Sequence, residues 1–424
     1  MRKNIVLFIN QLPRDTIQSL RDYGKEKRLG IKVGVLRNTK RRISKSDKKY
    51  LKEFADLEIR ADFDKPAKLI KLLRPYEENI LAVTARAGEE NVTDMAKIVA
   101  YLPYLRTPSK DSLLWATDKL TMRRRLRAYD KKISPKYTVA SDFKKSTLDK
   151  IKSKVGFPLI LKPADLTASL LVTMCFHEEE LRNALSKTFR KIRQVYKENK
   201  RQIEPTVLVE QFMEGSMYSI DGYVGSRGST YWCPMVHVKT GRDIGFEDFF
   251  GYQQITPTTL KKDSINQAET VAKKAVRALG LRSTAVHIEL MRTEEGWKVI
   301  EIGPRIGGFR NKMYKQSYGF DHGLNDILIR IPEPPKIRKS IKGYSATLKL
   351  FAKKEGILKK LKGIRRIKKL NSVVKVSVKK KIGDKCKFAK HGGKSVMNIY
   401  LFNKNRSDLL ADIRRIEQTV IIKT

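Results

Sequence analysis

Short apolar runs alternate with helical patterns over the first hundred residues of the chain. The runs are predicted to form strands, and they cover residues 5–9, 31–36, 57–60 and 80–84. Apolar positions at helical spacing over 14–27 and 91–105 predict helices that accompany them. This alternation predicts a parallel, doubly wound sheet. No Gly-x-Gly-x-x-Gly follows the first strand, so a dinucleotide site there is unsupported.

The pattern changes at two boundaries, the Arg-Thr-Pro-Ser stretch at 106–109 and the proline cluster at 332–335. Between them, apolar strand-like runs alternate with longer helical patterns. The main predicted elements of this middle part are a strand over 157–163, a helix over 178–199, a strand leading into a linker over 207–215, and a helix over 263–280. The chain is therefore expected to divide into three domains.

The last part of the chain combines short strands, Gly-containing turns and one helix. The predicted strands cover 346–351, 373–378, 396–402 and 420–422, and the helix begins at Ser407. This mixture predicts a small α+β domain.

Two acidic residues stand out because each interrupts a run of apolar residues. Residues 286–290 and 299–302 alternate with period two and are joined through a Gly-containing turn, which predicts a hairpin. If its strands pair antiparallel, Glu289 and Glu301 can face one another across them. Carboxylate oxygens at that separation suit Mg²⁺, with Arg305 close by for a transferred phosphoryl group. The alternative is a solvated acidic face, but the apolar neighbours favour buried carboxylates that need partners.

Length and charge set further limits. The 424 residues are 41% hydrophobic, which suits about three packed domains. The net charge is +45, and residues 331–424 alone hold 27 Lys and Arg against 6 Asp and Glu. Such a charge attracts nucleic acid or other polyanions, although a lysine-rich compositional bias is the favoured explanation.

No part of the sequence predicts a membrane protein or a disulfide framework. No apolar run approaches the roughly 18 residues of a membrane span. The apolar run after Met1 is too short for a signal peptide and lacks a small-residue cleavage site. Cysteines occur only at 175, 233 and 386. These features favour a reducing cytoplasm as the compartment.

Residues 301–308 read Glu-Ile-Gly-Pro-Arg-Ile-Gly-Gly and resemble the ATP-grasp signature Glu-x-Asn-x-Arg-x-Gly-Gly. The preceding His287-Ile288-Glu289 is similar to the amino-acid ligase and carbamoyl-phosphate-synthase-like group. Further motifs follow the family order: a lysine at 119, a lysine at 162 after Phe-Pro, and Glu-x-Phe-x-x-Gly from 210. The resemblance covers most of the chain.

This resemblance implies a fold with three parts. Residues 1–106 would form an N-terminal, doubly wound pre-ATP-grasp domain. Residues 107–332 would form the two-lobed ATP-grasp core, with the first lobe at about 138–208 and the second at about 209–332. Residues 336–424 would form a basic accessory α+β domain.

The resemblance also implies a nucleotide and metal site. Lys119 and Lys162 would contact phosphate oxygens, and Glu210 would accept from the adenine amine. The backbone of Gln211 and Met213 would contact the ring edge. The other implied positions are Ser169 in the phosphate loop, and Glu289 and Glu301 as ligands of Mg²⁺, with Mn²⁺ as an alternative.

The chain departs from the family pattern at three places. The loop at 164–170 lacks the glycines that let backbone N–H groups approach phosphates. Met217 stands where relatives often carry a ribose-binding acid. Gly303 replaces the metal-site asparagine, so water would have to supply that ligand.

The activity implied is ligation of a small carboxylate to an amine, with ATP converting the carboxylate into an acyl phosphate. Arg305 would stabilise the transferred phosphoryl group, while Arg310, Arg242 and His287 are weaker candidates for substrate contact. Two alternatives stay open: an ATP-binding regulator, and a polyanion-binding protein on a degenerate ATP-grasp scaffold. Assembly into a homo-oligomer also stays open.

Overall fold

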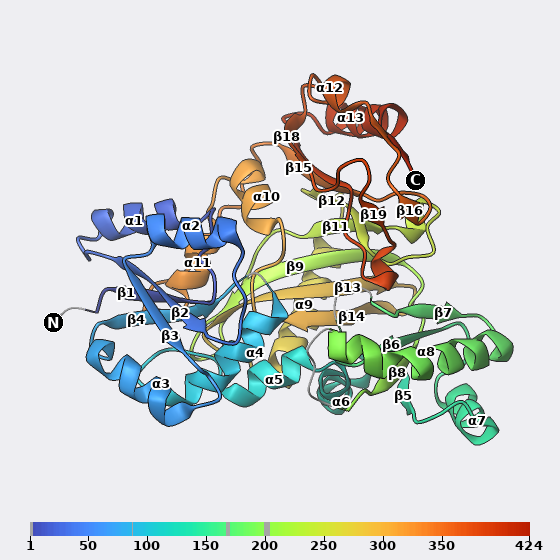
Figure 1. The fold of residues 1–424 in the computed structure, drawn as a ribbon, viewed down its shortest axis with the longest axis horizontal. Helices are drawn as coiled ribbons and strands as arrows, with labels where there is room; N and C mark the ends of the chain where they lie inside the picture. Colours follow the sequence, from blue (N-terminus) through green and yellow to red (C-terminus); the bar gives the residue numbers. More distant parts are fainter. Residues whose placement is uncertain (1–2, 87, 167–169, 199–203) are drawn as a thin grey trace.

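The computed structural model describes residues 3–86, 88–166, 170–198 and 204–424. Figure 1 shows an N-terminal unit on one side, a lobe carrying α8 below, and the C-terminal segment at the top of a large sheet. Within the described part, no helix combines the length and the apolar character needed to cross a membrane.

The N-terminal unit is a four-stranded parallel sheet in the order β3-β2-β1-β4. Its strands are β1 (Ile5–Ile9), β2 (Lys32–Asn38), β3 (Leu57–Ala61) and β4 (Ile80–Ala85), and its helices are α1 (Ile17–Glu26), α2 (Lys45–Phe54), α3 (Pro66–Leu73) and α4 (Glu89–Ile98). The prediction of a doubly wound parallel sheet is confirmed.

Strand β1 explains why helices cover both faces of this sheet. All five of its residues are buried, and successive side chains point to opposite faces. Leu7 and Ile9 pack into the core that includes residues of α3 and α4, whereas Val6 and Phe8 pack into the core with α1 and α2. Helix α4 ends earlier than the predicted 91–105 pattern, because a 3₁₀ turn and Pro103 follow it.

Two helices, α5 (Lys110–Thr117) and α6 (Lys119–Tyr129), lead into the first lobe. Its antiparallel sheet has the order β5-β8-β6-β7. The strands are β5 (Tyr137–Ala140), β6 (Leu159–Pro163), β7 (Thr173–Cys175) and β8 (Val207–Gln211), and the helices are α7 (Lys145–Lys154) and α8 (Glu178–Glu198). The amphipathic helix α8 buries Leu181, Leu185 and Ile192 in the core of this lobe.

The large sheet follows the path β14-β13-β9-β11-β12-β15-β20-β18, with β10 paired to β9. Its first strands are β9 (Ser216–Val224), β10 (Thr230–Trp232), β11 (Val236–Thr240), β12 (Gly251–Thr256), β13 (Thr284–Thr293) and β14 (Gly296–Gly303). Helix α9 (Lys262–Ala278) covers one face of this sheet. Its alanines pack there in a core that includes Ile288 and Leu290 of β13. The opposite face is therefore left for the site.

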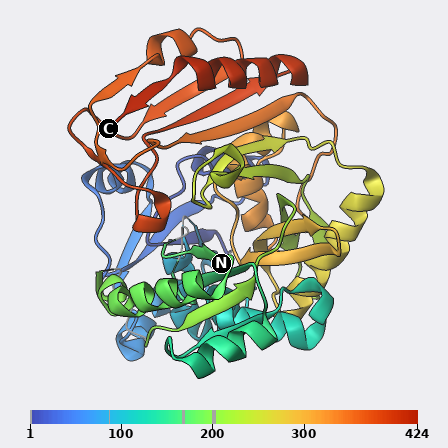
Figure 2. The ribbon, with the colours of Figure 1, turned by 90° about the vertical axis from the view of Figure 1, so that its right-hand side faces the viewer.

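The C-terminal segment continues the same sheet. Its elements are β15 (Tyr344–Leu350), β16 (Gly356–Ile357), β17 (Lys360–Lys362), α12 (Ile364–Ile367), β18 (Val373–Val378), β19 (Lys385–Cys386), β20 (Met397–Asn403), α13 (Arg406–Thr419) and β21 (Ile421–Lys423). Strand β15 pairs with β12, so the sheet crosses the predicted boundary at 332–336. Helix α13 lies along the C-terminal strands in Figure 2 and packs on them.

Two short helices connect this sheet to the N-terminal unit. They are α10 (Arg310–Ser317) and α11 (His322–Leu328). Asp326 of α11 accepts a hydrogen bond from Thr84 of β4 at 2.7 Å, and Ile327 packs into the N-terminal core. This docking holds the end of β4 close to the large sheet.

Candidate active site

The hairpin of β13 and β14 places two carboxylates opposite one another. The strands pair antiparallel, and Glu289 is the direct partner of Glu301. The register shifts immediately after Glu289, as in a β-bulge. Val286 and Ile288 are fully buried on the other face, so the apolar alternation directs both carboxylates to the free face. The predicted hairpin and its facing carboxylates are confirmed.

Five charged residues form what we call the paired cluster: Lys119, Arg123, Lys162, Glu210 and Glu301. The Lys119 Nζ lies 3.6 Å from the Glu301 Oε1 and donates to the Leu166 carbonyl at 2.8 Å. The Lys162 Nζ lies 2.8 Å from the Glu210 Oε2. The structure thus brings both predicted phosphate-contacting lysines to carboxylates of the site.

Arg123 is the centre of the paired cluster and was missed by the sequence analysis. Its guanidinium is fully buried and donates to both oxygens of Glu210, at 2.7 and 3.2 Å. It also donates to the carbonyls of Val299 and Ile300 on β14, at 2.9 and 2.6 Å. One side chain of α6 therefore ties the first lobe to the β13–β14 hairpin.

Charge pairing sets the protonation of these groups. Burial would raise the pKa of Glu210, but Arg123 and Lys162 outweigh it and lower the pKa to about 2. Burial likewise opposes ionisation of Glu301, and Lys119 and Lys162 lower its pKa below the usual value. Both carboxylates are therefore ionised at neutral pH.

The predicted adenine-contacting segment follows β8. Both oxygens of Glu210 already accept from protein donors, so an adenine amine would share an oxygen with them. The Gln211 backbone N–H donates to the Lys136 carbonyl at 2.9 Å. Within the described residues, the Met213 backbone has no recorded hydrogen bond and remains open to a ring edge.

Arg305 meets a carboxylate from the N-terminal unit. Its Nη2 lies 3.6 Å from the Glu89 Oε1, and its Nε is buried without a hydrogen-bond partner among the described residues. Burial raises the pKa of Glu89 to about 7, and the neighbouring Glu301 carboxylate adds to the rise. The side chain of Arg305 fills the space beside Gly303, where an added Cβ would lie 3.7 Å from it.

His287 is held by a buried aspartate. The His287 Nδ1 lies 2.8 Å from the Asp221 Oδ1, and its Nε2 lies 3.7 Å from the Glu289 Oε1. Asp221 also accepts from the Gly307 backbone at 2.7 Å. A side chain at Gly307 would meet the His287 ring at 2.5 Å, which explains the need for glycine in this turn. Asp221 thus orients both the histidine and the turn after Arg305.

The weaker substrate candidates have different surroundings. The Arg310 guanidinium is 2% exposed and donates to Gln254 at 2.5 Å and to Ser219 at 2.7 Å. Arg242 stacks over Phe212 at 5.0 Å from the ring centroid, outside the residues that line the site. Ser169 lies outside the described residues.

A pocket of about 880 Å³ lies over the free face of the large sheet. Its lining includes the predicted metal, catalytic and substrate residues Glu289, Glu301, Arg305, Arg310 and His287. It also includes Glu89 from α4 and residues of the C-terminal segment, among them Lys349 and Asn398. Three parts of the chain that are far apart in sequence therefore share one pocket.

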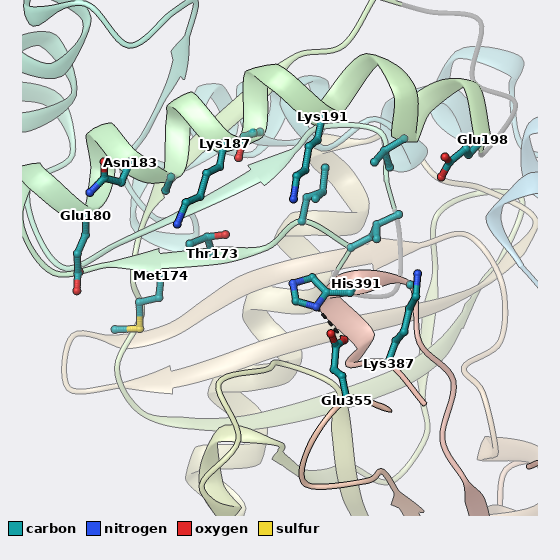
Figure 3. Close-up of a pocket in the computed structure, with 16 residues that line it drawn as sticks. Thr173, Met174, Glu180, Asn183, Lys187, Lys191, Glu198, Glu355, Lys387 and His391 are labelled. Carbon is teal, nitrogen blue, oxygen red and sulfur yellow. Dashed lines mark hydrogen bonds and ion pairs between the residues drawn. The ribbon is translucent and has the colours of Figure 1, made fainter. Parts of the chain in front are cut away.

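A second hollow, of about 1030 Å³, lies between α8 and the C-terminal segment. Figure 3 shows Lys187 and Lys191 extending into it from α8, with Lys387 and His391 on the opposite side. The His391 Nδ1 pairs with Glu355 at 2.9 Å. None of the predicted site residues that the structure describes lines this hollow.

Glu89 and Asp221 were also missed by the sequence analysis. A signal for Glu89 was present, because residues 88–90 follow the fourth strand of a parallel sheet, and ligands bind at the carboxyl ends of such strands. Asp221 gave no comparable signal, since it lies inside a nine-residue strand.

Residues 155–312 match the model of the ATP-grasp domain. This part of the chain is similar to an ATP-grasp domain. The match covers most of the first lobe and the whole hairpin with Glu289 and Glu301, so the resemblance noted from the sequence is confirmed.

Curated relatives include two proteins named alanine–anticapsin ligase. That of Bacillus amyloliquefaciens is 28% identical over 308 residues, and that of Bacillus subtilis is 29% identical over 311 residues. Each match covers 66% of this chain and 63% of the relative. The chain thus spans less than two thirds of the length of these relatives.

Solved structures confirm the fold over the whole chain. An L-amino acid ligase from Bacillus licheniformis superposes with a TM-score of 0.77 at 19% identity, covering 100% of this chain and 99% of its own. N5-carboxyaminoimidazole ribonucleotide synthetase from Thermotoga maritima gives a TM-score of 0.67 at 17% identity, with 99% of each chain covered. The predicted α/β and α+β architecture agrees with both.

Proposed function

We propose that the protein is an ATP-dependent carboxylate–amine ligase that converts a small carboxylic or amino acid into an acyl phosphate and joins it to an amine, releasing ADP and phosphate. The observation that carries the proposal is the facing pair Glu289 and Glu301, with Lys119 3.6 Å from Glu301 and Arg305 in the same pocket. The ligases similar to this chain support the reaction class.

The donors present fit a magnesium ion. Two carboxylates lie on neighbouring strands, and the described residues contain no group of three His, Cys, Asp or Glu that could hold a metal alone. Phosphate and water would supply the remaining ligands, as Mg²⁺ usually requires. When bound between Glu289 and Glu301, the ion would neutralise charge on the β- and γ-phosphates of ATP; Mn²⁺ is an alternative.

The protein groups around this pair position and stabilise charge. Lys119 and Lys162 would contact phosphate oxygens, and the backbone at Gln211 and Met213 would hold the adenine edge. The unpartnered Nε of Arg305 is a buried donor that a transferred phosphoryl oxygen would satisfy. No nucleophilic side chain is required, because positioning and electrostatic stabilisation account for this chemistry.

Two further residues would have supporting roles. Asp221 would keep His287 oriented toward Glu289, and Arg123 would keep Glu210 and Lys162 in place beneath the nucleotide.

The domain limits 1–106, 107–332 and 336–424 and the homo-oligomer remain predictions. The similarity to ligases favours turnover over an ATP-binding regulator or a polyanion-binding protein.

The test is ATP-dependent phosphate release with Mg²⁺ over pools of amino acids and small carboxylic acids. Release that depends on the pool should fall at least about 100-fold in Glu301→Gln, because the carboxylate that faces Glu289 is lost. Glu294→Gln is the matched control, since Glu294 lies in the exposed turn of the same hairpin. Full ATP consumption by both Glu301→Ala and Arg305→Ala would contradict the site assignment.

A further inference from the structure

The free face of the large sheet changes charge from one end to the other. At one end, β14 and β13 contribute Glu301 and Glu289 to the pocket. In the middle, β11 and β12 contribute Val238 and Gln254. At the other end, the C-terminal segment contributes four lysines, which we call the lysine wall: Lys349, Lys379, Lys380 and Lys394.

The alternation of side chains along β15 explains why Lys349 faces the pocket. Its neighbours Leu348 and Leu350 are buried in the core beneath α13. Alternation along β15 therefore places Lys349 on the opposite face, beside its strand partner Asn398. Both residues line the pocket.

The Lys349 ammonium is half-buried and makes no ion pair with any described residue. Its Nζ lies over the ring of Phe309, 5.2 Å from the ring centroid. Burial lowers the pKa of Lys349 and the Arg310 charge adds to this, while the Glu289 carboxylate opposes it without forming an ion pair. An enclosed cation of this kind is costly unless an anion joins it.

The other lysines of the wall come from two connections. Lys379 and Lys380 follow β18, where their backbone N–H groups both donate to the Val396 carbonyl. Lys394 lies just before β20. Among the described residues, none of these three forms an ion pair, although the Lys380 Nζ donates to the Lys385 carbonyl at 3.0 Å.

Among the described residues, no acidic residue of the pocket forms an ion pair with the wall, although the Glu289 charge partly offsets the effect of burial on Lys349. Glu301 is paired with Lys119, Glu89 with Arg305, and Glu289 with His287. Each pairing lies at the hairpin end of the sheet. The positive charge of the wall is therefore available to a ligand.

The basic composition of the chain does not explain Lys349. Compositional bias adds lysines to solvated surfaces, where they need no partner. Lys349 instead lies within a strand of the central sheet. The phosphates of ATP also have cations at the hairpin end, namely Lys119, Lys162 and Arg305, so they do not require the wall.

We propose that one substrate of the ligase carries an anionic group in addition to its reacting carboxylate, and that the lysine wall binds this group. The class we assign is the acidic amino acids, with the side-chain or second carboxylate held by Lys349, Lys379 and Lys394. A pocket of about 880 Å³ has room for such a substrate beside the phosphates, since typical ligand pockets measure roughly 300–1,000 Å³. This assignment rests on the proposed ligase function.

The experiment compares isosteres that differ in charge. Phosphate release is measured with L-glutamate against L-glutamine, and with L-aspartate against L-asparagine, at a fixed concentration of a neutral amino acid as the second substrate. O-phospho-L-serine forms a further arm that distinguishes a phosphate from a carboxylate as the anion. We expect kcat/KM to be at least about 10-fold higher for the anionic member of a pair, because charge-assisted hydrogen bonds are lost in the neutral one.

The wall is tested with the double variant Lys379→Gln/Lys394→Gln. KM for the anionic substrate should rise roughly 10- to 100-fold, with little change in kcat, because the contact is remote from the reacting group. The matched control is Lys187→Gln/Lys191→Gln, which removes the same charge from the second hollow shown in Figure 3. This control should leave KM unchanged.

Binding is measured in parallel, so that failure of the ligase function and failure of the wall can be told apart. Calorimetric titration of L-glutamate, L-aspartate and O-phospho-L-serine in the presence of Mg²⁺ and a non-hydrolysable ATP analogue does not depend on turnover. If binding weakens only in the Lys379/Lys394 variant, the lysine wall binds the anionic group, even if no phosphate is released. Equal use of both members of each pair, or anionic affinity unchanged in that variant, would overturn the proposal.

Discussion

The paired cluster is mostly buried, whereas the lysine wall combines the half-buried Lys349 and Lys380 with the exposed Lys379 and Lys394, and the two are built in opposite ways. In the paired cluster, Lys162 and Arg123 share the two oxygens of Glu210 at 2.7 to 3.2 Å. In the lysine wall, no described carboxylate lies against Lys349. The first arrangement stabilises the protein before any ligand binds, whereas in the second the half-buried Lys349 has no ion-pair partner among the described residues. Substitutions should therefore affect stability in opposite directions at the two places.

The largest effect is expected from Arg123→Met. This change leaves Glu210 with one cation and removes the donors of the Val299 and Ile300 carbonyls. Breaking a buried ion pair from one side typically costs about 3–5 kcal/mol. The free energy of the unfolding transition, measured with denaturant, should fall by that amount.

The control for this change is Arg124→Met, at the next and exposed position of α6. It should alter the unfolding free energy by less than about 0.5 kcal/mol. If Arg123→Met behaved like this control, the buried pairing would not contribute to stability, and the comparison between the two regions would fail.

The next effect concerns activity rather than stability. Glu289→Gln removes one of the two facing carboxylates and should lower the rate of phosphate release by about 100- to 1,000-fold. The Mg²⁺ concentration for half-maximal rate should rise as well. Thermal unfolding of the metal-free variant checks that the fold persists, and a normal Mg²⁺ dependence would show that Glu289 is not a metal ligand.

Glu89 gives a prediction about pH, made for the protein in EDTA without metal. Its pKa rises from 4.5 to about 7 on folding, so the folded state keeps a proton that the unfolded chain loses. The stability that Glu89 contributes is therefore fully present below pH 4.5 and is lost as the pH rises toward 7, by at most about 3 kcal/mol. Glu89→Gln should remove this fall.

The measurement is the unfolding free energy of the wild-type protein and of the variant at pH 4.5, 6 and 7.5. Glu89→Gln should become increasingly more stable than the wild-type protein across this range. Glu90→Gln controls for the loss of one charge from the same turn of α4, where Glu90 pairs with Arg41. A constant difference between wild type and Glu89→Gln would contradict the raised pKa.

The comparison also shows how far the sequence could predict this site. The hairpin with Glu289 and Glu301 follows from apolar alternation over a short stretch, and the pairing register confirms it. The parallel sheet follows from alternating strands and helices in the same way. Both predictions use information that is local in the sequence.

Arg123 and the lysine wall could not be found in this manner. Arg123 contacts residues that lie 87 and 177 positions away, and no periodicity signals such a pairing. The lysine wall depends on β15 joining the sheet next to β12, across the predicted domain boundary. In a chain with 90 lysines and arginines, these functional cations resemble all the others until the fold brings them together.

The smallest effect is also the sharpest test of the comparison. Lys349→Met keeps the length of the side chain and removes a half-buried charge that forms no ion pair with a described residue, so it should stabilise the protein by about 1 kcal/mol. Lys298→Met is its counterpart, because Lys298 on β14 is also buried but pairs with Glu295 at 2.8 Å. That change should be neutral or slightly destabilising. If Lys349→Met gains stability and binds L-glutamate more weakly, the Lys349 charge costs the protein stability and serves ligand binding. If both variants lose stability, Lys349 has a structural role like that of Lys298.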